Sequence, residues 1–318
     1  MKIFCPGGNV TIDRGGKMKK NLALLISGIV AMSTLTACGS SKPAETTAAA
    51  TTAAATEAST TAAATEAAAE TEAATEAAGE QGEAVTTATG KFTVGFDQEF
   101  PPMGFVGDNG EYTGFDLVLA QEVAKRLGLE YVPQPINWDA KDMELESGNI
   151  DCIWNGFTMQ GREDAYTWVG PYMANNQVLV VNADSDIASQ TDLAGKAVEV
   201  QKDSSGLNAI NDNADLLASL GSLTEVADYN TALMDLESGA CDAVCMDSIV
   251  AGYQIKSSGK NMKILDDTLA AEEYGIGFKK GDDALAKAVK DTLLEMSADG
   301  TVEKISNEWF GSNVFTLK

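Results

Sequence analysis

The chain has 318 residues, of which 47 are acidic and 22 basic, and it contains no histidine. A formal net charge of −25 makes nucleic acid and anionic lipid poor partners. The lack of histidine excludes a His-based catalytic triad, a His metal ligand and a His pH switch. We expect neither a metal site nor a cofactor, and no nucleic-acid partner.

An export leader is the first element that the sequence predicts. Lys19 and Lys20 precede the apolar run "NLALLISGIVAMSTLTAC", as in a secretory signal. Met18 is the natural start, which makes residues 1–17 a candidate start-site artefact. "LTAC" at 35–38 resembles a bacterial lipobox, which implies that residues 1–37 are removed and that Cys38 carries a lipid. A plain signal peptide or an uncleaved membrane anchor is the alternative.

The segment that follows, 38–90, is predicted to be a tether. After Cys38 it consists almost entirely of Ala, Thr, Glu, Ser and Gly, without an aromatic residue. Such a composition buries too little apolar surface to offset the entropy lost on ordering. We therefore expect residues 38–90 to be disordered and to join a lipid anchor to a folded part at 91–318.

The folded part alternates between strand and helix patterns. "KFTVGF" predicts a strand, "FDLVLAQEVAKRLG" an amphipathic helix that ends at glycine, and "EYVPQPI" and "DCIWN" strands around the short helix "DAKDMELESG". The later segments "KAVEVQ", "LTEVADY", "DAVCMD" and "MKILDD" again predict strands between helices. This order indicates an α/β fold with mostly parallel sheets.

Three cysteines, Cys152, Cys241 and Cys245, lie on or beside apolar runs of the folded part. Cys241 and Cys245 are four positions apart on one predicted strand, which is too far for a disulfide. We interpret all three as buried small hydrophobic residues, with a redox or metal role as the alternative.

An internal repeat indicates two similar lobes. "WDAKDMELESGNIDCIWNG" from Trp138 and "YNTALMDLESGACDAVCMD" from Tyr229 share Met-acid-Leu-Glu-Ser-Gly and an Asp three residues later. Both predict a helix, a tight glycine turn and a buried strand, although chance similarity between two common units is the alternative. Ligands of open α/β sheets bind beyond the carboxyl ends of the strands. The repeat places these ends at Asn155–Gly156 and at Met246–Asp247.

Seven segments in order resemble one known family. They are "VGFDQEFPPMGF", "GEYTGFDLVLAQEVAKRLG", "INWDAKDMELESGNIDCIWNGFTMQGRE", "DLAGKAVEVQKDSSG", "ALMDLESGACDAVCMD", "YGIGFKKGDDALAKAV" and "EKISNEWFG". This order is similar to that of the polar amino-acid solute-binding proteins (family 3) of ATP-binding-cassette importers, such as those for glutamine, histidine and lysine/arginine/ornithine. The resemblance implies a type II periplasmic-binding fold: two α/β lobes joined by two hinge strands, with the ligand in the cleft. Lobe 1 would comprise 91–177 plus 270–318, and lobe 2 would comprise 178–269.

The resemblance also implies a set of ligand-binding residues. An acid and two aromatic residues would meet the ligand side chain, a strand tip and an arginine would hold its α-carboxylate, a loop would close over it, and an acid would hold its α-ammonium. In that order these are Asp97, Phe100 and Trp138; Asn155, Gly156, Thr158 and Arg162; Gln201, Ser204, Ser205 and Gly206; and Asp247 with Met246 beside it. "TMQGR" is one residue shorter than family members commonly have between the Thr and the Arg, which affects the expected angle of Arg162.

Physical chemistry supports an Arg and Asp pair for a free amino acid. A guanidinium holds a carboxylate bidentately, and an ammonium buried in a cleft needs an acid. Each residue alone also has a plainer interpretation. Arg162 could be a solvated surface charge, Asp247 a helix N-cap, Asp97 a turn acid, and Phe100 and Trp138 core aromatics.

The sequence thus predicts an exported lipoprotein on the outer face of the cytoplasmic membrane, of the Gram-positive type. As a monomer it would capture a free polar amino acid, basic or glutamine/cystine-like, for an importer permease with its ATPase subunit. Phe100 and Trp138 around a cationic group, with Asp97 beside it, favour a basic ligand, whereas an acid that accepts from an amide favours glutamine. An enzyme of the same fold and the sensing domain of a receptor are the alternative functions.

The predicted anchor has a direct test. Cys38→Ala removes the sulfur that would carry the lipid, so the variant should be released from the cell surface. Its affinity for ligand should be unchanged, because Cys38 lies outside the folded part. Cell fractionation followed by calorimetry on the released protein measures both, and membrane retention of the variant would contradict the lipobox.

Overall fold

The computed structural model describes residue 87 and residues 89–318 of the chain. The predicted leader, Cys38 and nearly all of the predicted tether lie outside the described residues. Within residues 89–318, none of the helices combines the length and the apolar character that a membrane crossing takes. The same part of the chain contains no group of three or more metal-ligating side chains that could hold an ion.

The first part of the fold contains the strands and helices that precede a long strand, β7. Its strands are β1 (Lys91–Phe96), β2 (Glu99–Phe100), β3 (Gly104–Val106), β4 (Tyr112–Thr113), β5 (Glu130–Pro135) and β6 (Cys152–Thr158). Its helices are α1 (Phe115–Leu127), the single 3₁₀ turn η1 (Trp138–Ala140) and α2 (Lys141–Glu146). Helices α7 (Asp283–Ala298) and α8 (Thr301–Phe310) return to pack on α1. We refer to these elements together as lobe 1.

The second part lies between the two longest strands, β7 (Thr167–Asn182) and β11 (Met262–Phe278). It contains strands β8 (Ala197–Gln201), β9 (Ser222–Val226) and β10 (Ala243–Asp247). Its helical segments are η2 (Gln190–Leu193), α3 (Ser205–Asp212), α4 (Ala214–Ser219), α5 (Tyr229–Ser238) and α6 (Ser248–Ser258). We refer to these elements as lobe 2.

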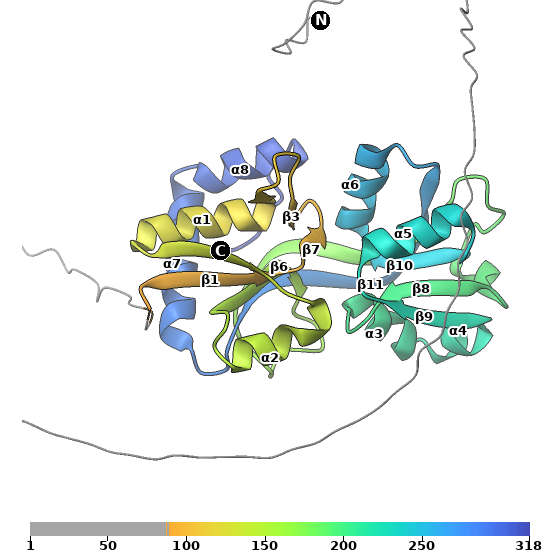
Figure 1. Cartoon of the computed structure of the whole chain (residues 1–318), viewed down its shortest axis with the longest axis horizontal. Helices are drawn as coiled ribbons and strands as arrows, with labels where there is room; N and C mark the ends of the chain where they lie inside the picture. The colour runs from red at the N-terminus through yellow and green to blue at the C-terminus, as the bar shows by residue number, and fades with distance from the viewer. Residues whose placement is uncertain (1–86, 88) are drawn as a thin grey trace, which may run out of the picture. The chain divides into compact units, whose positions relative to one another are not determined.

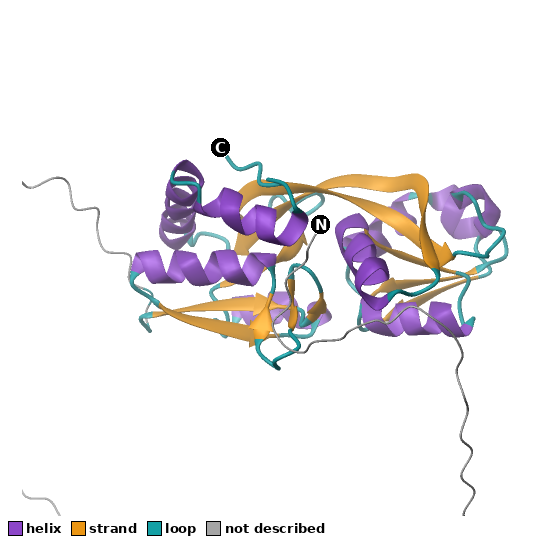
Figure 2. Ribbon diagram, turned by 90° about the horizontal axis from the view of Figure 1, so that it is seen from above, coloured by secondary structure: helices purple, strands orange, loops and turns teal. Residues whose placement is uncertain are grey.

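The two long strands connect the lobes. The strand order is β5-β1-β6-β11-β7-β10-β8-β9, with a separate small sheet β2-β3-β4 in lobe 1. One end of β11 pairs with β6 of lobe 1, and β7 pairs with β10 of lobe 2, both antiparallel. Between these ends, residues 173–177 of β7 pair with residues 270–274 of β11, and this antiparallel ribbon joins the two groups of helices in Figures 1 and 2.

The two halves of the sheet have equivalent orders, as the sequence repeat suggested. In each half a strand of the repeat, β6 or β10, lies antiparallel to a long strand and parallel to its other neighbour, β1 or β8. The glycine of each repeat has a positive φ, +75° at Gly148 and +79° at Gly239, which turns the chain back from the helix toward the strand. The carboxyl ends of β1, β6, β8 and β10 therefore lead to the region between the lobes.

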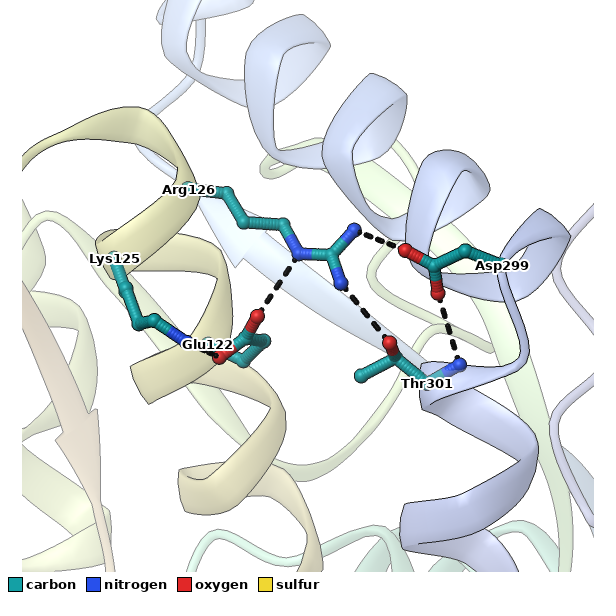
Figure 3. Close-up of polar contacts among 5 residues, drawn as sticks. All are labelled: Glu122, Lys125, Arg126, Asp299 and Thr301. Carbon is teal, nitrogen blue, oxygen red and sulfur yellow. Dashed lines mark hydrogen bonds and ion pairs between the residues drawn. The ribbon is translucent and has the colours of Figure 1, made fainter.

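Lobe 1 is completed by chain segments that are far apart in sequence. Phe115 of α1 packs edge-on against Phe310 of α8, with ring centroids 5.1 Å apart. At the end of α1, the Arg126 guanidinium pairs with Glu122 and reaches Asp299 Oδ2 at 2.7 Å and Thr301 Oγ1 at 2.9 Å (Figure 3). Arg126 thus connects α1 to the turn between α7 and α8.

The predicted α/β architecture with two lobes and two connecting strands agrees with this structure. Every predicted strand is present, but "MKILDD" is only the start of β11, and the periodicity gave no strand at β7. The predicted lobe limits, 91–177 with 270–318 and 178–269, stay predictions, because β7 and β11 run through both lobes without a break. Cys152, Cys241 and Cys245 are free and buried, as predicted for small hydrophobic residues.

Candidate functional site between the lobes

A small cavity lies where the carboxyl ends of the parallel strands of both lobes meet. Its volume is about 10 Å³, roughly enough for one water molecule. A larger molecule can enter only when the lobes move apart, which the two connecting strands permit as a hinge. Ten residues line the cavity, all of them predicted from the sequence: Phe100, Trp138, Asn155, Gly156, Thr158, Arg162, Gln201, Ser204, Ser205 and Asp247.

Arg162 reaches the cavity from lobe 1. It follows β6, in a turn closed by its own N–H donating to Met159 O at 3.0 Å. Its guanidinium donates to Thr158 O at 3.2 Å and, across the cleft, to Asp203 O at 3.4 Å. The guanidinium carbon also lies 5.2 Å from the centre of the Phe157 ring. The shortened segment before Arg162 therefore keeps the side chain at the cavity, bonded to carbonyl oxygens and to no carboxylate.

Asp247 reaches the cavity from lobe 2, at the end of β10, with 3% of the residue exposed. Its Oδ1 accepts hydrogen bonds from Asn175 Nδ2 at 2.6 Å and Tyr274 OH at 2.7 Å. Burial, and then the nearby Glu272 carboxylate, hold the pKa of Asp247 well above its ordinary value. Asp247 is the N-cap residue of α6 by position, but its side chain makes no capping hydrogen bond to this helix.

Asp97 follows β1 and is 6% exposed. It accepts from Glu99 N at 2.8 Å and, across the cleft, from Gln201 Nε2 at 2.6 Å. Burial raises the pKa of Asp97 to about 6, against the lowering effect of these hydrogen bonds. Asp97 lines an outer cavity of about 1000 Å³ and not the small one, whose lining it meets through its hydrogen bond with Gln201.

Hydroxyl and aromatic side chains complete the lining. Thr158 Oγ1 of lobe 1 lies 3.2 Å from Ser205 Oγ of lobe 2, and Ser204 caps α3 by accepting from Leu207 N at 3.1 Å. The Phe100 ring packs against Tyr229 of lobe 2 with centroids 5.9 Å apart. The Trp138 ring meets Phe157 edge-on at 5.5 Å, and Lys141 Nζ lies 5.4 Å from its centroid. Phe100 and Trp138 therefore each pack against another aromatic ring and also line the cavity.

Four of the predicted residues contribute less than expected. Asn155 lines the cavity, but its Oδ1 already accepts from Asp97 N at 3.0 Å. The Gly156 N–H donates to Asp116 Oδ2 at 2.7 Å and is not free for a carboxylate in this conformation. Met246 is fully buried in the core, because alternation along β10 points it away from the side of Asp247. Gly206 lies behind the lining, against Gln177.

Further contacts join the lobes at the rim of the cleft. Lys202 Nζ of lobe 2 pairs with Asp139 of lobe 1 at 2.8 Å. Lys141 pairs with Asp203, and Asn230 donates to Glu99. These polar contacts stabilise the closed arrangement of the two lobes.

The sequence reasoning missed three buried polar residues around the site. Asp116 holds the Gly156 N–H and the Tyr172 hydroxyl, whereas Asn175 and Glu272 lie opposite each other on the connecting strands. A signal for Asn175 was present, because "NNQ" at 175–177 interrupts an apolar run. For Glu272, the adjacent "EE" at 272–273 gives no signal of which acid is buried, and a strand places the two side chains on opposite faces.

Two α/β lobes, two connecting strands and a cleft lined by both lobes define a two-lobed binding protein. The family model of bacterial extracellular solute-binding proteins, family 3, matches residues 92–312. The chain therefore belongs to this family, and its fold is the type II periplasmic-binding fold.

Individual relatives and structures agree with this assignment. The L-cystine-binding protein TcyJ of Escherichia coli K12 is 32% identical over 228 residues, which cover 71% of this chain and 84% of TcyJ. The L-cystine-binding protein TcyA of Bacillus subtilis is 33% identical over 229 residues, covering 71% of this chain and 83% of TcyA. The crystal structure of an ABC uptake transporter substrate-binding protein from Streptococcus pneumoniae with bound histidine is similar, with a TM-score of 0.70 and 33% identity over 72% of this chain and 96% of that one.

Asp116 generates a prediction about pH. Burial raises its pKa from 3.8 to about 7, so the folded protein keeps a proton there that the unfolded chain has already released. The unfolding free energy should therefore fall as the pH rises from about 4 to about 7. In Asp116→Asn this decrease in the unfolding free energy should be smaller, by up to about 4 kcal/mol. Urea unfolding across this pH range measures the difference, with the exposed Asp108→Asn as the matched control. Parallel curves for Asp116→Asn and the wild type would contradict it.

Proposed function

We propose that the protein captures a free polar amino acid between its lobes and delivers it to an ABC importer. The observation that carries the proposal is one cavity lined by Arg162 from lobe 1 and Asp247 from lobe 2. A zwitterion offers a carboxylate to the guanidinium and an ammonium to the acid, and both charges need such partners when buried. The Thr158 and Ser205 hydroxyls add polar groups on the same lining.

The ligand side chain would lie toward Asp97, between Phe100 and Trp138. A carboxylate there favours a basic group or a donor such as an amide N–H, and aromatic faces attract a flat cationic group. A second carboxylate on the ligand would meet Asp97 without a cationic partner. We therefore propose a basic or a glutamine/cystine-like ligand. The relatives named for cystine, and the similar structure with bound histidine, support this range.

The outer cavity favours a long ligand. It adjoins the inner one at Trp138, which lines both. Among its lining residues, Lys202 is the one cation and the acids are Asp97, Glu99, Asp139, Glu144, Glu225 and Asp228. The far half of L-cystine carries both a positive and a negative group, so it could find partners of both signs there. L-cystine is therefore the first ligand to test.

The proposed role is binding without turnover. The family consists of solute-binding proteins, and the cavity lining contains no cysteine or lysine nucleophile. Its two serines and its threonine have no histidine or lysine beside them to act as a base. Incubation with a panel of amino and keto acids should thus return each compound unchanged.

The remaining parts of the proposal concern the cell. Lipid on Cys38 would hold the protein on the outer face of the membrane, and the tether at 38–90 would let the folded part reach a permease with its ATPase subunit. The match to an extracellular family supports export. We propose that the protein acts as a monomer in this role.

The zwitterion site predicts the effect of two substitutions. Arg162→Ala or Asp247→Ala should each weaken binding by roughly 2–5 kcal/mol, because one charge of the ligand would be left unpaired in the closed cleft. Calorimetry with the ligand and with its N-acetylated form measures this. Lys287→Ala and Asp291→Ala, which remove an exposed ion pair on α7, are the matched controls and should bind normally. Equal affinity for the N-acetylated form would refute the proposed site.

The role of Asp97 predicts the ligand class. L-Cystine, L-arginine, L-glutamine and L-glutamate should be titrated into the wild type and into Asp97→Asn. The wild type should bind at least one of the first three and bind glutamate weakly. Asp97→Asn should weaken a basic ligand more than glutamine, because only the former loses an opposite charge. If glutamate binds the wild type best, the assignment of Asp97 to the side-chain end of the site is wrong.

A further inference from the structure

Two carboxylates, and not one, lie at the Asp247 end of the cavity. Glu272 is 5% exposed and lies on β11, directly opposite Asn175 of β7 in the ribbon that joins the lobes. Its Oε1 accepts from Asn175 Nδ2 at 2.6 Å and from Gln177 Nε2 at 2.7 Å. Asn175 Nδ2 is also 2.6 Å from Asp247 Oδ1. The two carboxylate oxygens therefore cannot be further apart than twice this distance.

The hydrogen bonds of its oxygen fix the orientation of the Asn175 side-chain amide. Asn175 Oδ1 accepts from the Ser248 hydroxyl at 3.1 Å and from the Ile249 N–H at 3.4 Å. Because the backbone N–H can only donate, the amide oxygen must face α6 and the NH₂ group must face the two acids. Asp247 at the end of β10 and Glu272 on β11 thus both accept hydrogen bonds from the same NH₂ group of Asn175.

No protein cation balances these two acids. Among the described residues, Asp247 and Glu272 form no ion pair with any lysine or arginine. Arg162 lines the same cavity, but its recorded hydrogen bonds go to carbonyl oxygens. Two buried like charges at this separation are costly, so the pair must hold a proton or receive a cationic group.

The other titratable groups around the pair are uncharged near neutral pH. They are the hydroxyls of Tyr229 on α5 and Tyr274 on β11 and the thiol of Cys245 on β10. Burial first, and then the two acids, raise the pKa of each of these groups. Neutral donors from β7 and α3, Gln177 and Ser205, complete the surroundings. We therefore assign a change of charge at this end of the cavity to Asp247, whose pKa burial and the neighbouring Glu272 raise.

Glu272 is connected to the cavity lining through a hydroxyl. Ser205 Oγ, which lines the cavity, lies 3.5 Å from Glu272 Oε1 and accepts from Gln177 Nε2 at 3.0 Å. A group bound beside Ser205 and Asp247 therefore also lies near Glu272. Asp247 Oδ1 already accepts two hydrogen bonds, so the three donors of an ammonium would find Asp247 Oδ2 and the Ser205 hydroxyl, which leaves one donor for Glu272.

We propose that Glu272 is a second carboxylate partner for the ligand's α-ammonium, and that Asp247, which lies beside it, releases a proton when an amino acid binds. This inference rests on the proposed function. The protons balance: the ammonium arrives protonated, its three N–H groups remain, and the proton of Asp247 leaves to solvent. Ligand affinity should then rise with pH until Asp247 is fully ionised, by up to about tenfold per pH unit for one proton released.

The test is calorimetry of L-cystine, L-arginine and L-glutamine in two buffers that differ in ionisation enthalpy. The difference in apparent binding heat gives the number of protons released. The wild type should release a substantial fraction of one proton at mildly acidic pH, and less at alkaline pH. If an amino acid binds without proton release at any pH, the role of Glu272 is overturned while the proposed function stands. If none of the three amino acids binds, the result contradicts the proposed function itself, on which this inference rests.

Three variants separate a charge effect from a structural one. Glu272→Gln keeps the shape but removes the like charge, so proton release and the pH dependence of affinity should both decrease, and binding should weaken most at high pH. Glu272→Asp keeps a carboxylate and should retain proton release. Glu273→Gln makes the same charge change on the exposed side of β11 and should behave as the wild type. A Glu272→Gln variant that binds more weakly by the same factor at every pH, with unchanged proton release, would show a merely structural role and overturn the proposal.

Discussion

The pairing of β7 with β11 is the constraint on which the rest of the structure depends. Each strand serves both lobes, and between the lobes the two strands have only each other as partners. A ribbon of this kind can bend and twist while it keeps its backbone hydrogen bonds. The lobes can therefore change their separation without unfolding, and the residues on the ribbon stay in the same register. Side chains that must act together in both open and closed forms are best placed there.

The polar floor of the site follows from this arrangement. Asn175, Gln177, Glu272 and Tyr274 all come from the ribbon. Asn175 and Tyr274 bond Asp247 at the end of β10, and Asn175 and Gln177 bond Glu272. The acid end of the cavity is thus built largely on the connection, whereas Arg162 belongs to lobe 1. Excess negative charge in a buried cleft is unfavourable, and a cationic group reduces this cost. The cleft therefore favours a molecule that carries a positive group.

Much of this organisation could be predicted from the sequence, because it follows from local patterns. The repeat located β6 and β10, and all ten residues that line the cavity were among those predicted. The differences from the predicted roles have physical reasons. Met246 lies next to Asp247 in sequence but on the other face of β10, and the Asn155 side chain is used to hold Asp97 N. The hydrogen bond of Gly156 to Asp116 joins two segments 40 positions apart, and the pairing of Asn175 with Glu272 joins two 97 apart. Such long-range partners depend on tertiary structure, which no short pattern contains.

The way in which lobe 1 is closed has a consequence for the order of folding. Strand β6 has β1 on one side and needs β11 on the other, and α1 packs on α7 and α8, which come still later in the chain. The N-terminal strands and helix of lobe 1 therefore cannot complete their packing until the C-terminal segment has been synthesised. Lobe 2, whose helices and whose strands β8, β9 and β10 lie in one continuous segment, has most of its contacts available earlier. Until β11 arrives, one edge of β6 is unpaired, and unpaired strand edges promote aggregation. A chain of this topology benefits from staying unfolded until all of it has emerged.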